Sequence, residues 1–164
     1  MTRLEFICAP KESLKAVPLL YYVGGYKYQS RNDMIYQVFI FPDEDIITDL
    51  IVLRKDGWLW VGKYFAWDGA SGPTIDTRTN MRAGHAHDAL YALFRMGKLD
   101  PDKWRPQADW IIGDLMRRDG ANNARAWYYE KAVNVFAAYA ADPRNAKRIL
   151  VAPSRKDMIK GMPA

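Results

Sequence analysis

Cysteine, histidine and long apolar runs are all scarce in this sequence. Cys8 is the only cysteine among 164 residues, which excludes an internal disulfide bond and suits a reducing compartment. The only histidines are His85 and His87, too few for the multi-histidine metal centres of helical phosphohydrolases. No apolar run approaches the roughly 20 residues that span a bilayer, and the N-terminal stretch lacks the pattern of a secretory signal peptide. We therefore expect a protein made in the cytosol that is not integral to a membrane.

Apolar and aromatic side chains, by contrast, are plentiful. Hydrophobic residues make up 49% of the chain and aromatic residues 13%, which excludes a globally disordered protein. A chain of this length can bury about two-thirds of the surface that it exposes when unfolded, so it needs no disulfide or metal to fold. The sequence predicts one domain over residues 1–141, followed by a basic arm over residues 142–164.

The net charge of +5 is concentrated in that arm, which holds six basic and two acidic residues. The rest of the chain is nearly neutral, which argues against a nucleic-acid-binding surface on the body of the protein. The arm itself could contact phosphates or an acidic partner, or it could be a solvated tail.

Strand signals dominate about residues 26–67. The runs "MIYQVFIF", "DIITDLIVL" and "WLWVGKYFAW" are rich in β-branched and aromatic residues and are separated by turn residues. Asp56 and Gly57, between the last two runs, form a strong hairpin signal. This half of the chain is predicted to be an antiparallel β-meander.

The apolar pattern changes to helical spacing over about residues 77–141. One helix is expected to end at Gly97, and a second to begin at Asp100 and Pro101, which are typical of a helix N-terminus. A third is expected from about residue 122 to the break at Asp142. Strands followed by three helices, the first two forming an antiparallel pair, indicate an α+β fold.

Both histidines lie on the first of these helices. Residues four apart share a helix face, so His87 lies with Tyr91, whereas the neighbours His87 and Asp88 project about 100° apart and are not expected to bond to each other. The second helix offers Asp109. Across an antiparallel helix pair, this carboxylate would fix the imidazole tautomer and leave the other ring nitrogen available as a base.

A glycine-rich loop, "WDGASGP", follows the last predicted strand. Its backbone can direct carbonyl oxygens and the Asp68 carboxylate toward a hard cation, or amide groups toward an anion. Asp68 and Asp88 together would supply the negative charge that calcium prefers. The plain alternative is a tight turn without a ligand.

Other arrangements of reactive residues are less favoured. On a helix, His85 and His87 diverge by about 200°, so they are not expected to share a metal, and His85 is predicted at the surface or in a supporting position. Ser71 does not stand in the order of a nucleophile elbow. Five of the six tryptophans are expected to pack in the core and sheet, the alternative being that an exposed subset forms a binding face: Trp58, Trp60, Trp104, Trp110 and Trp127.

Several motifs together resemble a known family. The loop "WDGASGP", then "HDALY", "ADWIIGDLM" and "ARAWYYEKAV", are similar to an uncharacterised family of bacteriophage and prophage proteins. The resemblance covers about residues 58–140 and rests on an aspartate-containing loop followed by a His-Asp-x-Leu-Tyr helix. It implies a phage protein of the host cytoplasm or the virion, with phage structural proteins or a host protein as partners.

More distantly, the same motifs resemble the bacterial and fungal secreted phospholipases A2. Those enzymes have a calcium loop, a His-Asp-x-x-Tyr helix and an aspartate on the antiparallel helix. Here Asp68 precedes His87 by 19 positions and Asp109 follows it by 22, whereas the cross-linking cysteines of those lipases are absent. The resemblance implies that His87 is the general base, that Asp109 orients it, and that Tyr91 supports both. It also implies a calcium site at these residues: Asp68, Gly69 and Asp88.

Two classes of function are open on the sequence. One is a calcium-dependent ester hydrolase, whose substrate would be a lipid or another ester of the bacterial envelope. The other is a non-enzymatic phage structural or accessory protein, such as a tail or neck component or a host-modulating factor, that keeps the helix pair as a scaffold.

Overall fold

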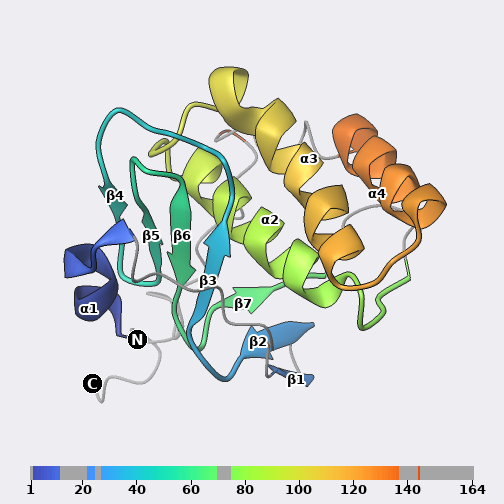
Figure 1. Cartoon of the computed structure of the whole chain (residues 1–164), viewed down its shortest axis with the longest axis horizontal. Coiled ribbons are helices and arrows are strands. Elements are labelled where there is room, and N and C mark those ends of the chain that lie inside the picture. Colours follow the sequence, from blue (N-terminus) through green and yellow to red (C-terminus); the bar gives the residue numbers. More distant parts are fainter. Residues whose placement is uncertain (1, 12–21, 25–26, 70–74, 137–143, 145–164) are drawn as a thin grey trace, which may run out of the picture.

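The computed structural model describes residues 2–11, 22–24, 27–69, 75–136 and 144. The predicted arm over 142–164 thus lies outside the described residues apart from Arg144, as does the predicted end of the third helix. Figure 1 shows the elements, which are α1 (Arg3–Cys8), β1 (Tyr22–Gly24), β2 (Tyr28–Ser30), β3 (Met34–Gln37), β4 (Ile46–Ile47), β5 (Ile51–Leu53), β6 (Trp58–Val61), β7 (Ala66–Trp67), α2 (Met81–Arg95), α3 (Pro101–Arg118) and α4 (Asn123–Phe136).

The fold is α+β, as the sequence predicted, with the strands divided between two antiparallel sheets rather than joined in one meander. The larger sheet has the order β3-β6-β5-β4 and the smaller one the order β1-β2-β7. The run after Asp56 and Gly57 is shared between both sheets, because the backbone turns between β6 and β7. Tyr64 adopts φ +72° in this turn, and the Phe65 amide donates to the Gly62 carbonyl.

The larger sheet is buried on both faces. Successive side chains of a strand point to opposite faces, and each of its longer strands places at least one residue toward α1. Ile35, Val52 and Trp60 are paired across the strands and pack with Phe6 of α1 in a small cluster. The alternate positions form the main core with α2: Met34, Tyr36, Ile51, Leu53, Leu59 and Val61.

The six-residue helix α1 is fixed at both ends. Thr2 and Glu5 form a reciprocal capping box at its N-terminus. At the other end the Arg54 guanidinium donates to the carbonyl oxygens of Phe6 and Ala9, at 3.2 and 2.6 Å. These contacts hold α1 against the outer face of the sheet (Figure 1).

α2 lies between the sheet and α3, which explains why it is buried on nearly every side (Figure 1). Gly97, at φ +63°, ends it with a Schellman motif, and the Asp100 side chain caps α3 as predicted. The Arg82–Asp119 salt bridge joins the start of α2 to the end of α3, so the two helices are antiparallel. No helix in the described part of the chain combines the length and the apolar character needed to cross a membrane.

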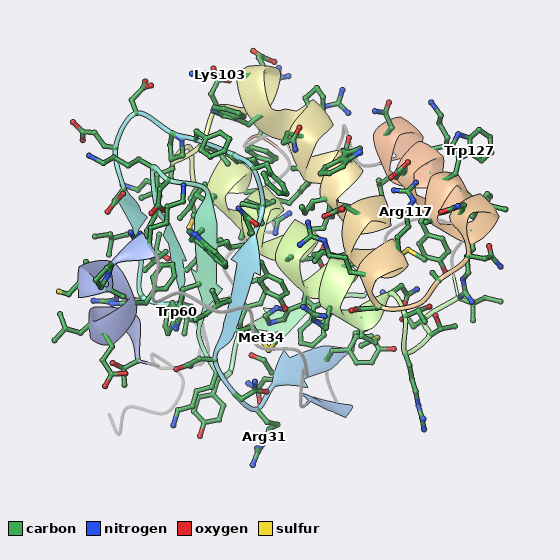
Figure 2. The ribbon with its side chains drawn as sticks, viewed as in Figure 1. Arg31, Met34, Trp60, Lys103, Arg117 and Trp127 are labelled. Carbon is green, nitrogen blue, oxygen red and sulfur yellow. The ribbon has the colours of Figure 1, made fainter. Side chains whose placement is uncertain are left out.

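The expectation that the five named tryptophans pack in the core and sheet is wrong for two of them. Trp60 is buried, but Trp110 on α3 and Trp127 on α4 are 41% and 56% exposed. Figure 2 shows Trp127 on the outer side of α4. The inward face of α4 is formed instead by Ala126 and Tyr129, which belong to the main core.

Candidate functional site

His87 and Asp109 meet in the interface between α2 and α3. Each lies near the middle of its helix, and each side chain is only 2% exposed. His87 Nε2 is 3.2 Å from Asp109 Oδ1, a hydrogen bond in which the nitrogen donates because a carboxylate can only accept. In the neutral imidazole this leaves the lone pair on Nδ1. The helix pair thus brings together the imidazole and the carboxylate that the sequence analysis paired.

Tyr91 contacts the same carboxylate from one turn further along α2. Its hydroxyl donates to Asp109 Oδ1 at 2.6 Å, and its ring lies 4.1 Å from the imidazole, centroid to centroid. Burial, followed by the hydrogen bond to Asp109, raises the pKa of Tyr91, so its hydroxyl keeps the proton that it donates. Asp109 Oδ1 is therefore held by two donors from α2.

Arg105 belongs to this network, although no motif pointed to it. Its guanidinium is 3.6 Å from Asp109 Oδ2, an oxygen with no hydrogen-bond partner among the described residues. The same guanidinium donates to the Asn134 carbonyl of α4 at 3.4 Å. The four-residue spacing of Arg105 and Asp109 on α3 is the sequence signal that could have revealed the pair.

Asp88 lies on the other side of the imidazole. Its Oδ1 is 3.6 Å from His87 Nδ1, too long for a hydrogen bond, as the helix geometry predicted, but within the range of an ion pair. Burial alone would lower the pKa of His87. The hydrogen bond to Asp109 and the charge of Asp88 outweigh this effect and raise the pKa above its usual range.

The loop stem after β7 lies next to Asp88. The Asp68 amide donates to Asp88 Oδ2 at 3.2 Å. Gly69 follows at φ +82°, where a Cβ atom would lie 2.7 Å from Asp76 Oδ2. The structure therefore brings Asp68, Gly69 and Asp88 together, whereas the rest of the loop, 70–74, lies outside the described residues.

The side chains at this stem do not form a ready metal centre. Within the described ranges, no three His, Cys, Asp or Glu side chains are grouped so that they could hold a metal ion. Asp88 accepts the Asp68 amide with one oxygen and faces His87 with the other. A calcium ion would have to displace these contacts and take most of its ligands from backbone carbonyls and water.

His85 is not at the surface, which was one of the two positions that the sequence analysis allowed for it. It is fully buried, with Nδ1 2.8 Å from the Tyr36 hydroxyl and with the rings of Phe65 and Trp67 packed edge-on against the imidazole. The strand β7 covers this side of α2, which helical periodicity alone could not reveal. Burial lowers the pKa of His85 to about 3, so this histidine is neutral.

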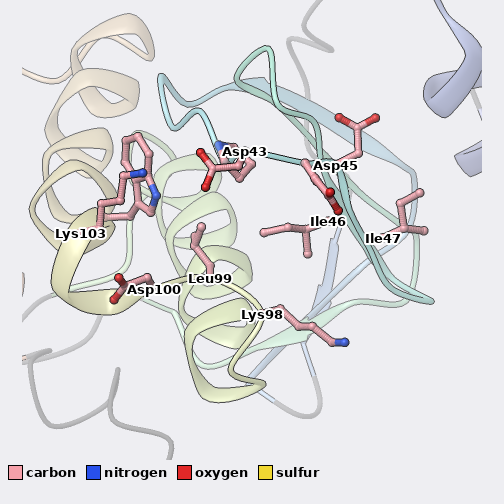
Figure 3. A pocket seen from close by; sticks show the side chains of 11 residues that line it. Asp43, Asp45, Ile46, Ile47, Lys98, Leu99, Asp100 and Lys103 are labelled. Atoms are coloured by element: carbon pink, nitrogen blue, oxygen red, sulfur yellow. The ribbon is translucent and has the colours of Figure 1, made fainter.

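A separate groove of about 820 Å³ lies between the β3–β4 connection and the α2–α3 connection. Figure 3 shows Asp43 and Asp45 from the first connection, Lys98 and Leu99 from the second, and Lys103 from the first turn of α3. The groove contains none of the residues around His87, and its mixed charge selects no single class of ligand.

Comparison of the chain with models of known protein families, with curated proteins and with solved structures gave no match in any of the three.

Proposed function

We propose that this protein is an ester hydrolase in which His87 is the general base, assisted by calcium. One observation carries the proposal: Tyr91, Asp109 and His87 form a continuous chain of hydrogen bonds that leaves Nδ1 facing Asp88. A carboxylate that holds one ring nitrogen of a histidine orients the other for proton transfer.

In this reaction Nδ1 of His87 takes a proton from water as the water oxygen attacks the ester carbonyl carbon. The same nitrogen then returns the proton to the departing alkoxide, so no net proton is lost. Asp109 stabilises the imidazolium between these steps, and Tyr91 keeps the carboxylate in place. A calcium ion at Asp68, Gly69 and Asp88, when bound, would polarise the ester carbonyl and offset the Asp88 charge.

The substrate class follows from the resemblance to phospholipases A2. We propose a lipid, or another ester of the bacterial envelope, as the substrate of a phage-encoded enzyme acting in the host cytoplasm or from the virion. The phage origin rests on the motifs of the loop and the helices.

The first test is fatty-acid release from phosphatidylglycerol vesicles, with calcium or with a chelator. We expect calcium-dependent release by the wild type and a loss of about 10²- to 10⁴-fold in His87→Gln. Asp43→Asn, a change at the groove remote from His87, should retain the activity. The hydrolase proposal fails if the wild type releases no fatty acid.

Calcium binding is measured separately, by titration calorimetry on the full chain. Asp88→Asn keeps the shape of the side chain but removes its charge, and we expect at least a tenfold weaker affinity. Asp43→Asn, the matched carboxylate control, should bind as the wild type does. Equal affinities in the wild type and Asp88→Asn would remove Asp88 from the proposed site.

A second candidate, a non-enzymatic phage structural or accessory protein, is favoured by a different observation. Both ring nitrogens of His87 face carboxylates, an arrangement that stabilises the imidazolium, which cannot act as a base. The exposed Trp127 and Tyr128 on α4 would suit a protein partner. In this case His87→Ala should leave phage production intact, whereas deletion of 142–164 should abolish assembly.

A further inference from the structure

The carbonyl oxygen of Ile75 accepts hydrogen bonds from three side chains. The Tyr129 hydroxyl donates at 2.6 Å, Asn80 Nδ2 at 3.1 Å and the Arg125 guanidinium at 3.5 Å. Asn80 and Tyr129 are only 2% and 3% exposed, and they also bond to each other at 3.1 Å. Two buried polar groups, one from the N-cap position of α2 and one from α4, therefore converge on one backbone atom of the segment that precedes α2.

The N-cap residue of α2 and a residue of α4 also hold the next turn of this segment. The Thr77 amide donates to Asn80 Oδ1 at 2.8 Å, and the Arg125 guanidinium donates to Thr77 Oγ1 at 3.0 Å. Buried side chains of this kind retain their partners, because an unpaired buried donor or acceptor is costly. The segment 75–77 is therefore fixed to the start of α2 and to α4.

Asp76, within this fixed segment, reaches the other stem of the loop. Its Oδ2 accepts the Tyr28 hydroxyl at 2.9 Å and lies where a side chain on Gly69 would be. Gly69 is bonded to Asp68, whose amide donates to Asp88. A continuous series of contacts thus connects the Tyr129 hydroxyl on α4 to the Asp68–Asp88 pair beside His87.

We propose that Tyr129 and Asn80 are positioning residues, which set the place of Asp68 and Gly69 opposite Asp88 by fixing Ile75 and Asp76. The proposal rests on the proposed function in one respect, that Asp68 and Asp88 are the calcium-binding residues. It gives α4, which contributes no residue to the calcium site, a role in shaping that site.

The test compares Tyr129→Phe with Tyr128→Phe by amide hydrogen exchange, followed by NMR on the full chain. Tyr129→Phe removes the shortest bond to Ile75, whereas Tyr128→Phe removes a hydroxyl from its exposed neighbour. We expect the Asp68 amide to exchange about tenfold faster in Tyr129→Phe, with the α2–α3 amides unchanged. Tyr128→Phe should exchange as the wild type does.

Calcium affinity provides the second measurement. We expect Tyr129→Phe to bind calcium about tenfold more weakly than Tyr128→Phe. Unchanged Asp68 exchange in Tyr129→Phe, or equal acceleration at every amide, would overturn the positioning role. A wild type that binds no calcium would overturn the calcium site instead, and the exchange rates would still decide whether Tyr129 positions Asp68. If Tyr129→Phe does not fold, Arg125→Gln takes its place in the same measurements. This substitution removes the longest of the three hydrogen bonds to the Ile75 carbonyl.

Discussion

His85 and His87 stand two positions apart on α2 but occupy opposite electrostatic environments. His85 packs among aromatic rings and is neutral, whereas His87 lies between the carboxylates of Asp88 and Asp109. One side of α2 is covered by the strand β7 and the other by α3. The side of the helix, rather than the residue type, therefore decides which protonation state each histidine favours.

This difference predicts how stability depends on pH. Between pH 5 and the unfolded-state pKa of 6.5, the unfolded chain binds a proton at His85 and the folded chain does not, because its pKa is about 3. The free energy of unfolding should therefore fall on acidification, by at most about 1.4 kcal/mol per pH unit from this residue. His87, whose folded pKa is raised, is protonated in both states near pH 5 and contributes little slope there. Toward pH 6.5 only the unfolded chain loses the His87 proton, which opposes the effect of His85, so the comparison with a His85 variant is needed to isolate it.

Urea unfolding of the wild type and His85→Gln, at intervals between pH 5 and 6.5, measures this effect. We expect the variant to be less stable at pH 7 but to lose less stability than the wild type as the pH falls. Parallel curves for the two proteins would show that His85 is protonated in the folded state.

The candidate pair could be predicted because its geometry is local to two helices. Helical spacing places His87 and Asp109 near the middle of adjacent antiparallel helices, and the structure joins them. The burial of His85 could not be predicted, since it depends on β7, which pairs with a strand almost forty residues earlier in the chain. The proximity of Asp76 to Gly69 could not be predicted either, because it depends on how the two ends of the loop are placed in the folded chain.

At the scale of the element, the best predictions come from end signals. Asp100 caps α3 and Gly97 ends α2, because each satisfies backbone groups within a few residues. The division of the strands into two sheets depends instead on the turn at Tyr64, an unusual conformation for a residue other than glycine. The start of α1 also has an end signal in the sequence, because Thr2 and Glu5 have the three-residue spacing of a capping box.

The crossing of α3 and α4 at Gly113 supports a prediction about packing. A methyl group at Gly113 would collide with the Glu130 side chain, which pairs with Arg117 at 2.8 Å. We expect Gly113→Ala to destabilise the wild type by about 1 kcal/mol, because the clash exceeds the gain in helix propensity. In a Glu130→Ala background the same change should stabilise the protein by about 1 kcal/mol.

Urea unfolding of the four proteins of this double-mutant cycle gives the coupling energy directly. Additive effects of the two substitutions would mean that α3 and α4 are not in close contact at Gly113.

At the scale of the whole molecule, the described residues form two hydrophobic clusters on opposite faces of the larger sheet. The main core includes Phe94, whereas Phe6 belongs to the small cluster under α1. α1 is short, and besides the small cluster it contacts Arg54 and, through Arg3, the Thr48 carbonyl and Asp49. Because few of these contacts are buried, α1 can detach without unfolding the rest.

We therefore expect unequal effects from the same substitution in the two clusters. Phe94→Ala should lower the free energy of unfolding by about 3–5 kcal/mol, and Phe6→Ala by clearly less. In Phe6→Ala the α1 amides should exchange rapidly while those of α2 stay protected. Leu4→Ala, a change at an exposed position of the same helix, is the control and should have little effect. Equal losses at Phe6 and Phe94 would mean that the clusters unfold as one unit.

The strand order of the larger sheet also bears on self-association. Its outer strands are β3 and β4, and an outer strand can recruit another polypeptide through its open backbone groups. β4 is only two residues long and follows the acidic stretch Asp43–Asp45, so like-charged copies repel each other there. Neutralising that stretch would remove a safeguard against fibrous aggregates, even though no residue of the core would change.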